Sequence, residues 1–163
     1  SGVAKITFAP IAKSLREVRL DAIDLDIEAV ESSHQLESHH LDEEHVVFLF
    51  AEPIPAGDET TITVTYSAEP KEGLFFRTPA MGYKEGDTHL WTQGEPQKHR
   101  YWFPSYDYPN ERFTTEVICR VPDGMTVLSN GRLVGADLED GLLAYHWLQD
   151  QPCLLYTSDA ADD

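Results

Sequence analysis

Alternation of apolar and polar residues with a period of two constrains the fold of this chain more than any other feature. It is clearest in residues 60–66, where β-branched and polar residues alternate, and it recurs in residues 113–121. Successive side chains of a strand point to opposite faces, so this pattern predicts strands with one buried face. Other segments of strand length are residues 3–8, 18–30 in two pieces, 46–50 and 142–148.

Short turn sequences separate these segments. Residues 85–87, 122–124 and 139–141 pair an acidic residue with glycine, and residues 129–131 read Ser-Asn-Gly. Residues 53–58 contain two prolines and a glycine, which predicts irregular structure because proline lacks an amide donor. Many short strands between closely spaced turns indicate a mostly β, antiparallel sandwich or an open barrel.

The charge of the chain excludes several kinds of partner. Twelve Lys and Arg against 29 Asp and Glu give a formal net charge of −17 over 163 residues. Nucleic acids and anionic membranes are bound by basic patches, so we expect neither as a partner. The sequence has no apolar run of the roughly 20 residues that cross a bilayer and no secretory-signal pattern at its start, and it leaves the compartment open. Two cysteines, Cys119 and Cys153, either pair or stay free.

The most informative stretch is residues 91–113, which read W-T-Q-G-E-P-Q-K-H-R-Y-W-F-P-S-Y-D-Y-P-N-E-R-F. This stretch resembles the aminopeptidase N-type zinc metallopeptidases, whose pattern is T-Q-x-E, then A/H-R, then F-P-x-x-D-x-P. Four further segments agree in order with the family, namely residues 20–27, 73–76, 122–131 and 147–156. The resemblance implies the twisted, saddle-like antiparallel β-sandwich that is the amino-terminal domain of these enzymes. The resemblance extends over residues 1–152, which we expect to be a truncated form of this domain. We expect residues 153–163 to be a non-native or flexible tail.

The resemblance implies a substrate-binding role for Gln93, Gly94 and Glu95. In the family the glutamate of T-Q-x-E binds the α-ammonium group of a peptide, and the glutamine lies beside the substrate backbone. A carboxylate opposite an ammonium group forms a charge-assisted hydrogen bond, and glycine permits a close approach. Without the family pattern, Glu95 would read as an ordinary solvated loop acid.

A second set of motif residues is expected to be architectural. It consists of Arg100, Pro104, Asp107 and Pro109. We expect Arg100 to form a buried ion pair with Asp107.

The zinc site of the family is missing from this sequence. The family carries H-E-x-x-H on a helix, where two histidines at i and i+4 bind one ion and the glutamate acts as general base. No H-E-x-x-H occurs in residues 1–163. Zinc is therefore expected only in the parent enzyme, and this chain alone is expected not to hydrolyse peptides.

A histidine-rich stretch offers a weak alternative metal site. His39, His40 and His45 lie among acidic residues between two predicted strands. Imidazole and carboxylate bind divalent ions, but the spacing matches no structural zinc site, and a polar loop facing water is the stronger interpretation.

These observations leave two function classes. The first is a fragment of a zinc aminopeptidase that binds the amino end of a peptide and docks against the missing catalytic domain. The second is a stand-alone, non-catalytic β module that binds a protein or a metal. In the first case an exposed docking face and an unpaired strand edge favour self-association, so a homodimer is also expected.

Overall fold

The structure, a computed structural model, describes residues 1–154. These residues form eleven β-strands and two short 3-10 helices, and every strand pair is antiparallel. The prediction of a mostly β, antiparallel fold is therefore confirmed. The chain divides into two compact units, Ser1–Asp107 and the part from Tyr108 onward.

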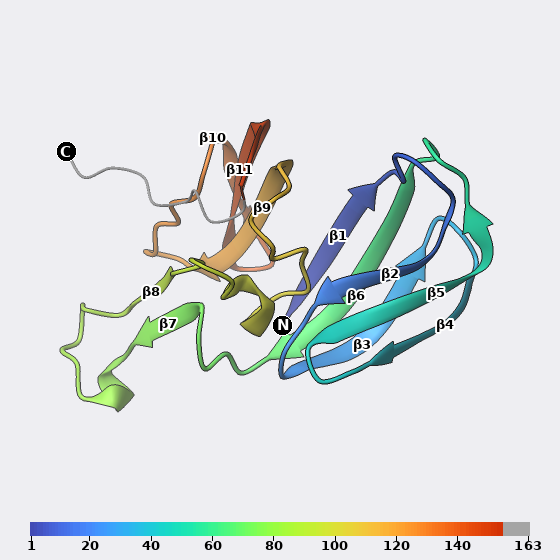
Figure 1. Ribbon diagram of the computed structural model, residues 1–163. Helices are drawn as coiled ribbons and strands as arrows, with labels where there is room; N and C mark the ends of the chain where they lie inside the picture. Colours follow the sequence, from blue (N-terminus) through green and yellow to red (C-terminus); the bar gives the residue numbers. More distant parts are fainter. Residues whose placement is uncertain (155–163) are drawn as a thin grey trace. The chain divides into compact units, whose positions relative to one another are not determined.

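The first unit contains two three-stranded sheets (Figure 1). One sheet has the order β1 (Gly2–Phe8), β6 (Thr60–Ala68) and β3 (Leu25–Ser32), and the other β2 (Leu15–Asp21), β5 (His45–Ile54) and β4 (Leu36–Leu41). Each sheet contributes one apolar face to a shared core. Its fully buried members include Val46, Phe48, Phe50, Ile62 and Val64. The two sheets therefore form a sandwich, as the period-two alternation predicts.

Two segments of the first unit differ from the prediction. Pro53 and Ile54 belong to β5 rather than to an irregular loop, because the register shift between Leu15 and Glu17 makes a bulge where proline's missing donor is tolerated. Residues 36–41 form β4 rather than a loop. Among the described strands β4 pairs only with β5, and it is exposed at every residue except Leu36, which packs against the core, so most of its positions need no apolar residue.

A two-stranded hairpin ends the first unit's set of strands. β7 (Leu74–Arg77) pairs with β8 (His89–Thr92), and the connection between them contains a 3-10 helix, Pro79–Met81. Residues 85–87 therefore lie in an eleven-residue connection and not in a tight hairpin turn. A two-stranded sheet is only marginally stable by itself, so contacts among its side chains matter for its order.

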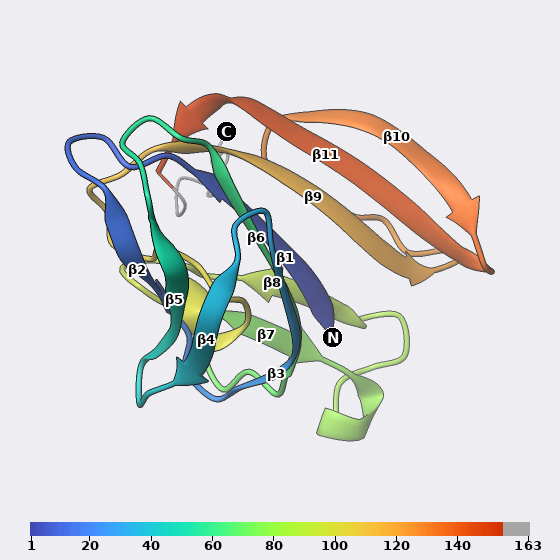
Figure 2. The same cartoon turned by 90° about the vertical axis from the view of Figure 1, so that its right-hand side faces the viewer.

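The second unit contains one sheet of long strands (Figure 2). Its order is β10 (Arg132–Glu139), β11 (Leu142–Cys153) and β9 (Phe113–Pro122). Asp140 and Gly141 connect β10 to β11 with φ values of 51° and 82°, which a type I′ hairpin turn requires. Residues 122–124 end β9 in a turn, but β9 pairs with β11 and not with β10, so this turn does not form a hairpin.

The cysteines do not form a disulfide. Cys153 lies opposite Phe113, whereas Cys119 lies six residues further along β9, about 20 Å away at the rise of a strand. Burial raises the pKa of the Cys119 thiol. The prediction of a tail from residue 153 stays untested, because Cys153 ends β11 and residues 155–163 lie outside the described part. Within residues 1–154, no helix is long and apolar enough to span a bilayer.

The core of the first unit gives a test at high pH. Burial raises the pKa of Tyr66 from 10.0 to about 12. The folded state therefore keeps the neutral phenol to a higher pH than the unfolded chain does. This stabilising contribution is fully present below pH 10 and is lost as the pH rises to about 12. Tyr66→Phe should remove this part of the pH dependence of unfolding, whereas Tyr83→Phe, at an exposed tyrosine, should leave it in place. Denaturant unfolding at pH 9 to 12 measures the free energy of unfolding of both variants. An identical decrease of this free energy with pH in the two variants would contradict the assignment.

Candidate functional site

The loop after β8 carries the residues that the sequence predicts to bind substrate. Gln93 and Gly94 follow β8 directly, Glu95–Gln97 form a turn, and the Glu95–Pro96 peptide bond is cis. Two backbone hydrogen bonds close the loop at its base. The amide of Gln93 donates to the carbonyl of Gly73 (2.9 Å), and the amide of Lys98 donates to the carbonyl of Gly94 (2.8 Å). The loop is thus fixed at both ends while its tip remains in solvent.

An aromatic stack orders the hairpin that supports this loop. The rings of Phe75 and Trp91, which face each other across β7 and β8, stack with centroids 5.5 Å apart. The guanidinium of Arg77 lies over the Tyr83 ring (4.9 Å) and over the Trp91 ring (5.7 Å). Stacked and cation–π contacts each contribute on the order of 1 kcal/mol, which compensates for the small size of the hairpin.

Gly94 is in direct contact with His99. Gly94 is buried, and a Cβ placed on it would overlap the His99 ring. The φ of Gly94 is not in the left-handed region, so the need for glycine here comes from the ring and not from the backbone. A similar close approach occurs at Gly73, where a Cβ would overlap the carbonyl of Lys98 and where φ is 77°.

Asp107 connects the residues that follow the loop. Its carboxylate accepts hydrogen bonds from His99 Nδ1 (3.0 Å), from the Arg100 amide (3.2 Å) and from Arg100 Nε (3.3 Å). The side chains of His99, Arg100 and Asp107 are 4%, 13% and 1% exposed. The Arg100–Asp107 pair expected from the sequence is therefore present and buried. Since a carboxylate only accepts, His99 carries its hydrogen on Nδ1, which fixes the ring orientation.

Asp21, at the end of β2, completes this group. Its Oδ1 pairs with Arg100 Nη2 at 2.9 Å, and its Oδ2 accepts from the Asp107 amide at 2.9 Å. The backbones of Asp21 and Ser105 also exchange two hydrogen bonds. Asp21 thereby connects residues 99–107 to the sandwich. Arg100 is shared between two carboxylates, a geometry that its planar, multi-donor guanidinium suits.

Sequence reasoning did not assign roles to Asp21 and His99. Both lie in segments that match the family pattern, Leu-Asp-Ala at residues 20–22 and His-Arg at 99–100. Their place in that pattern was the available indication that they matter. The signal was weak because an isolated Asp in a strand and an isolated His beside an Arg are common on surfaces. Their partners lie 86 and 8 residues away in sequence, and only the fold brings them together.

The other predicted site residues are distributed as follows. Glu95 and Gln93 are exposed, and no ion pair of Glu95 occurs within residues 1–154. The nearby cation Lys98 pairs instead with Glu72 at 2.8 Å. Pro104 is buried in the first unit, whereas Pro109 is exposed and belongs to the second. The carboxylate of Glu95 is therefore free to meet a cation from outside the described chain.

The three candidate metal-binding histidines do not come together. His39 and His40 are consecutive on β4, so their side chains point to opposite faces. His45 begins β5, and its Nδ1 lies 3.1 Å from Asp42 Oδ1. Over residues 1–154, no group of three or more His, Cys, Asp or Glu is arranged to hold a metal. Among the described residues, these three histidines are thus not arranged around a single ion.

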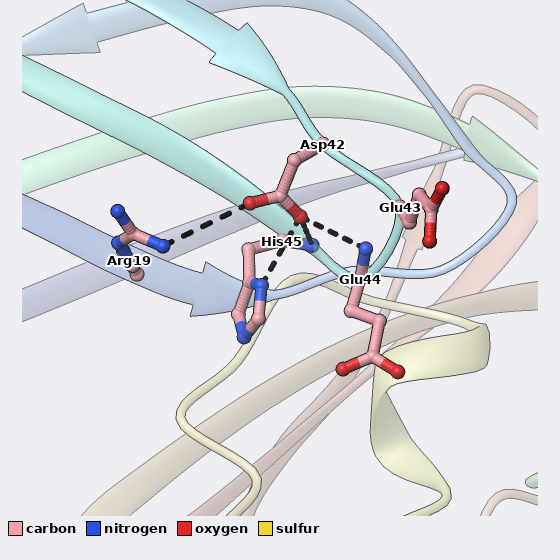
Figure 3. A pocket seen from close by; sticks show the side chains of 5 residues that line it. All are labelled: Arg19, Asp42, Glu43, Glu44 and His45. Carbon is pink, nitrogen blue, oxygen red and sulfur yellow. Dashed lines mark hydrogen bonds and ion pairs between the residues drawn. The ribbon is translucent and has the colours of Figure 1, made fainter.

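A shallow pocket of about 350 Å³ lies at the turn between β4 and β5 (Figure 3). Its lining, Arg19 and residues 42–45, contains none of the predicted substrate-binding residues. The amides of Glu44 and His45 donate to Asp42 Oδ1 at 2.9 Å and 2.8 Å. The bond from Glu44 is the main reason that the pKa of Asp42 lies below its usual value. Asp42 thus serves to shape the turn of the hairpin.

Two ion pairs of different burial test the importance of Asp107. Asp107→Ala should destabilise the fold by about 3–5 kcal/mol, because it leaves His99 buried without its acceptor and leaves Arg100 with Asp21 alone. Glu37→Ala removes an exposed pair with Arg16 of 2.8 Å and should cost about 0–1 kcal/mol. Urea unfolding followed by circular dichroism measures both. A cost for Asp107→Ala no greater than that for Glu37→Ala would show that the buried group is not a structural centre.

Curated relatives of this chain are aminopeptidases. Mouse aminopeptidase B is 28% identical over 48% of this chain, which corresponds to 12% of its own length. Human aminopeptidase RNPEPL1 is 23% identical over 62% of this chain and 14% of its length. This chain therefore spans only a small part of the relatives that it matches.

Solved structures and a family model cover much more of the chain. The crystal structure of an M1 zinc metallopeptidase from Deinococcus radiodurans superposes with a TM-score of 0.74 at 17% identity. A mutant of the Deinococcus radiodurans enzyme bound to a Tyr-Ser-Ala substrate gives a TM-score of 0.76 at 18% identity. Both alignments include 94% of this chain and 36% of the other. These likenesses show the fold, and the model of the Peptidase M1 N-terminal domain matches residues 1–156. The chain therefore belongs to the Peptidase M1 N-terminal domain family.

Proposed function

We propose that this chain supplies the part of a zinc aminopeptidase that binds the α-ammonium group of a peptide substrate. The observation that carries the proposal is the state of Glu95. Its carboxylate is exposed and without an ion pair in the described residues, at the tip of a loop whose base is closed by two backbone hydrogen bonds. A fixed carboxylate offers an ammonium group a charge-assisted hydrogen bond and sets the register of the peptide.

Gln93 and Gly94 support this role in different ways. Gln93 is exposed next to Glu95, so its amide is available to the peptide backbone beyond the amino group. Gly94 has no side chain that would stand between the loop and an approaching ligand. The partners that we propose are accordingly the amino terminus of a peptide and the catalytic domain of a longer polypeptide.

The chemistry of cleavage is proposed to reside in that catalytic domain. Zinc in such an enzyme activates a water molecule and polarises the scissile carbonyl. The present residues offer neither a metal site among those described nor an H-E-x-x-H sequence anywhere in the chain. Binding the ammonium group positions a substrate but breaks no bond, so this chain contributes orientation alone.

Ligand binding tests the role of Glu95 directly. Leucinamide, which has a free ammonium group, should shift the amide resonances of Gln93, Gly94 and Glu95 in a saturable manner. N-acetyl-leucinamide, which lacks the charge, should not. Glu95→Gln should weaken leucinamide binding by about two- to fivefold, the range expected for one exposed ion pair.

The matched control for this titration is Glu85→Gln. Glu85 is an exposed acid in the connection between β7 and β8, and its removal changes the net charge equally. Equal binding of leucinamide and its acetylated form, or equal losses for the two variants, would reject Glu95 as the ammonium acceptor.

Turnover tests the assignment of cleavage to another domain. Incubated with leucine p-nitroanilide and added zinc, the chain should release nitroaniline no faster than buffer with zinc does. The physical reason is that a positioned substrate without an activated water has no nucleophile. A chelator-sensitive rate that follows protein concentration would overturn this assignment.

A further inference from the structure

The His99 ring contacts Gly94, which is joined by one peptide bond to Glu95, the residue proposed to bind substrate. Gly94 precedes Glu95, and the space that a Cβ of residue 94 would fill is taken by the His99 ring. The ring therefore occupies the volume on one side of the loop backbone where residue 94 turns toward Glu95. A displacement of the ring by even a few tenths of an ångström must displace the backbone of Gly94, because interiors pack without spare volume.

The His99 ring is itself held from several directions. Its Nδ1 donates to Asp107 at 3.0 Å, and only 4% of its side chain is exposed. The Phe103 ring packs edge-on to the His99 ring with centroids 5.6 Å apart, and the centroid of the Trp102 ring lies 6.2 Å from that of His99. The Phe103 amide donates to the His99 carbonyl at 3.1 Å, which fixes its backbone. The ring is thus a rigid surface, and the loop is the exposed element that rests on it.

We propose that His99 is a positioning residue that sets the place of the Glu95 carboxylate through its contact with Gly94. Asp107 orients the ring, and the ring sets the backbone of Gly94. The link to substrate rests on the proposed function of Glu95, whereas the positioning itself does not. The inference gives the buried His99–Asp107 pair a specific task at the loop in addition to its part in stability.

Two variants of His99 separate positioning from stability. His99→Asn retains an amide that can donate to Asp107 but removes the ring that meets Gly94. His99→Ala removes both. A purely structural role predicts that His99→Asn, with its donor kept, leaves the loop as it is. Positioning predicts that the amide resonance of Glu95 shifts in His99→Asn as it does in His99→Ala. His39→Asn, at an exposed histidine on β4, is the matched control and should leave that resonance unchanged.

Gly94→Ala tests the contact from the other side. In the parent chain the added methyl group overlaps the ring, so we expect a lower Tm and a shifted Glu95 resonance. In the His99→Ala background the ring is absent, and the same substitution should change both quantities much less. Equal effects in the two backgrounds would overturn the contact as the cause. This non-additivity is the signature of two side chains that compete for one volume.

Leucinamide affinity connects the positioning to recognition. His99→Asn should weaken binding by about the same two- to fivefold factor as Glu95→Gln, and the double variant should be no weaker than either one. If the parent chain fails to bind leucinamide, the proposed function of Glu95 is rejected, while the resonance and Tm measurements still decide the positioning. A Glu95 resonance that is unmoved in His99→Asn, or an unchanged affinity in a parent that does bind, would overturn the inference.

Discussion

The buried carboxylate of Asp107 is the interaction on which the rest of the first unit's site depends. It accepts from His99 and twice from Arg100, and Arg100 in turn pairs with Asp21 at the end of β2. Removing a carboxylate from water costs free energy, and this cost is offset only when hydrogen bonds and ion pairs occupy its acceptor positions. The group therefore holds the irregular chain between residues 99 and 107 in one conformation without any regular secondary structure beyond a single 3-10 turn.

Strands of both units were predictable because burial on one face imposes a period of two. Residues 60–66 and 113–121 lie within β6 and β9, and the Asp140-Gly141 hairpin was evident from its turn residues. β4 was missed for the opposite reason. Only Leu36 of this edge strand packs against the core, and the positions after it are exposed, so its run of Glu, Ser and His carries no periodic signal.

The candidate site was predictable only in part. The resemblance pointed to Gln93, Gly94 and Glu95 as a loop, and the structure places them together after β8. It did not point to what supports them. His99 and Asp21 take their significance from contacts between distant parts of the chain, and Gly94 from a ring that fills the space beside it. Packing of this kind cannot be read from a single sequence, because it depends on which two positions meet in the folded chain.

The fit of the ring against Gly94 has a consequence for how related chains can differ. A side chain at position 94 and the ring at position 99 would occupy the same space, so the residue types at these two positions depend on each other. A related protein with a side chain at position 94 can keep this loop only if position 99 carries a smaller residue than histidine. Unless that smaller residue keeps a donor, as asparagine does, an oxygen of Asp107 would then need a water molecule or another side chain. A change at one exposed loop is thereby paired with a rearrangement in the buried interior.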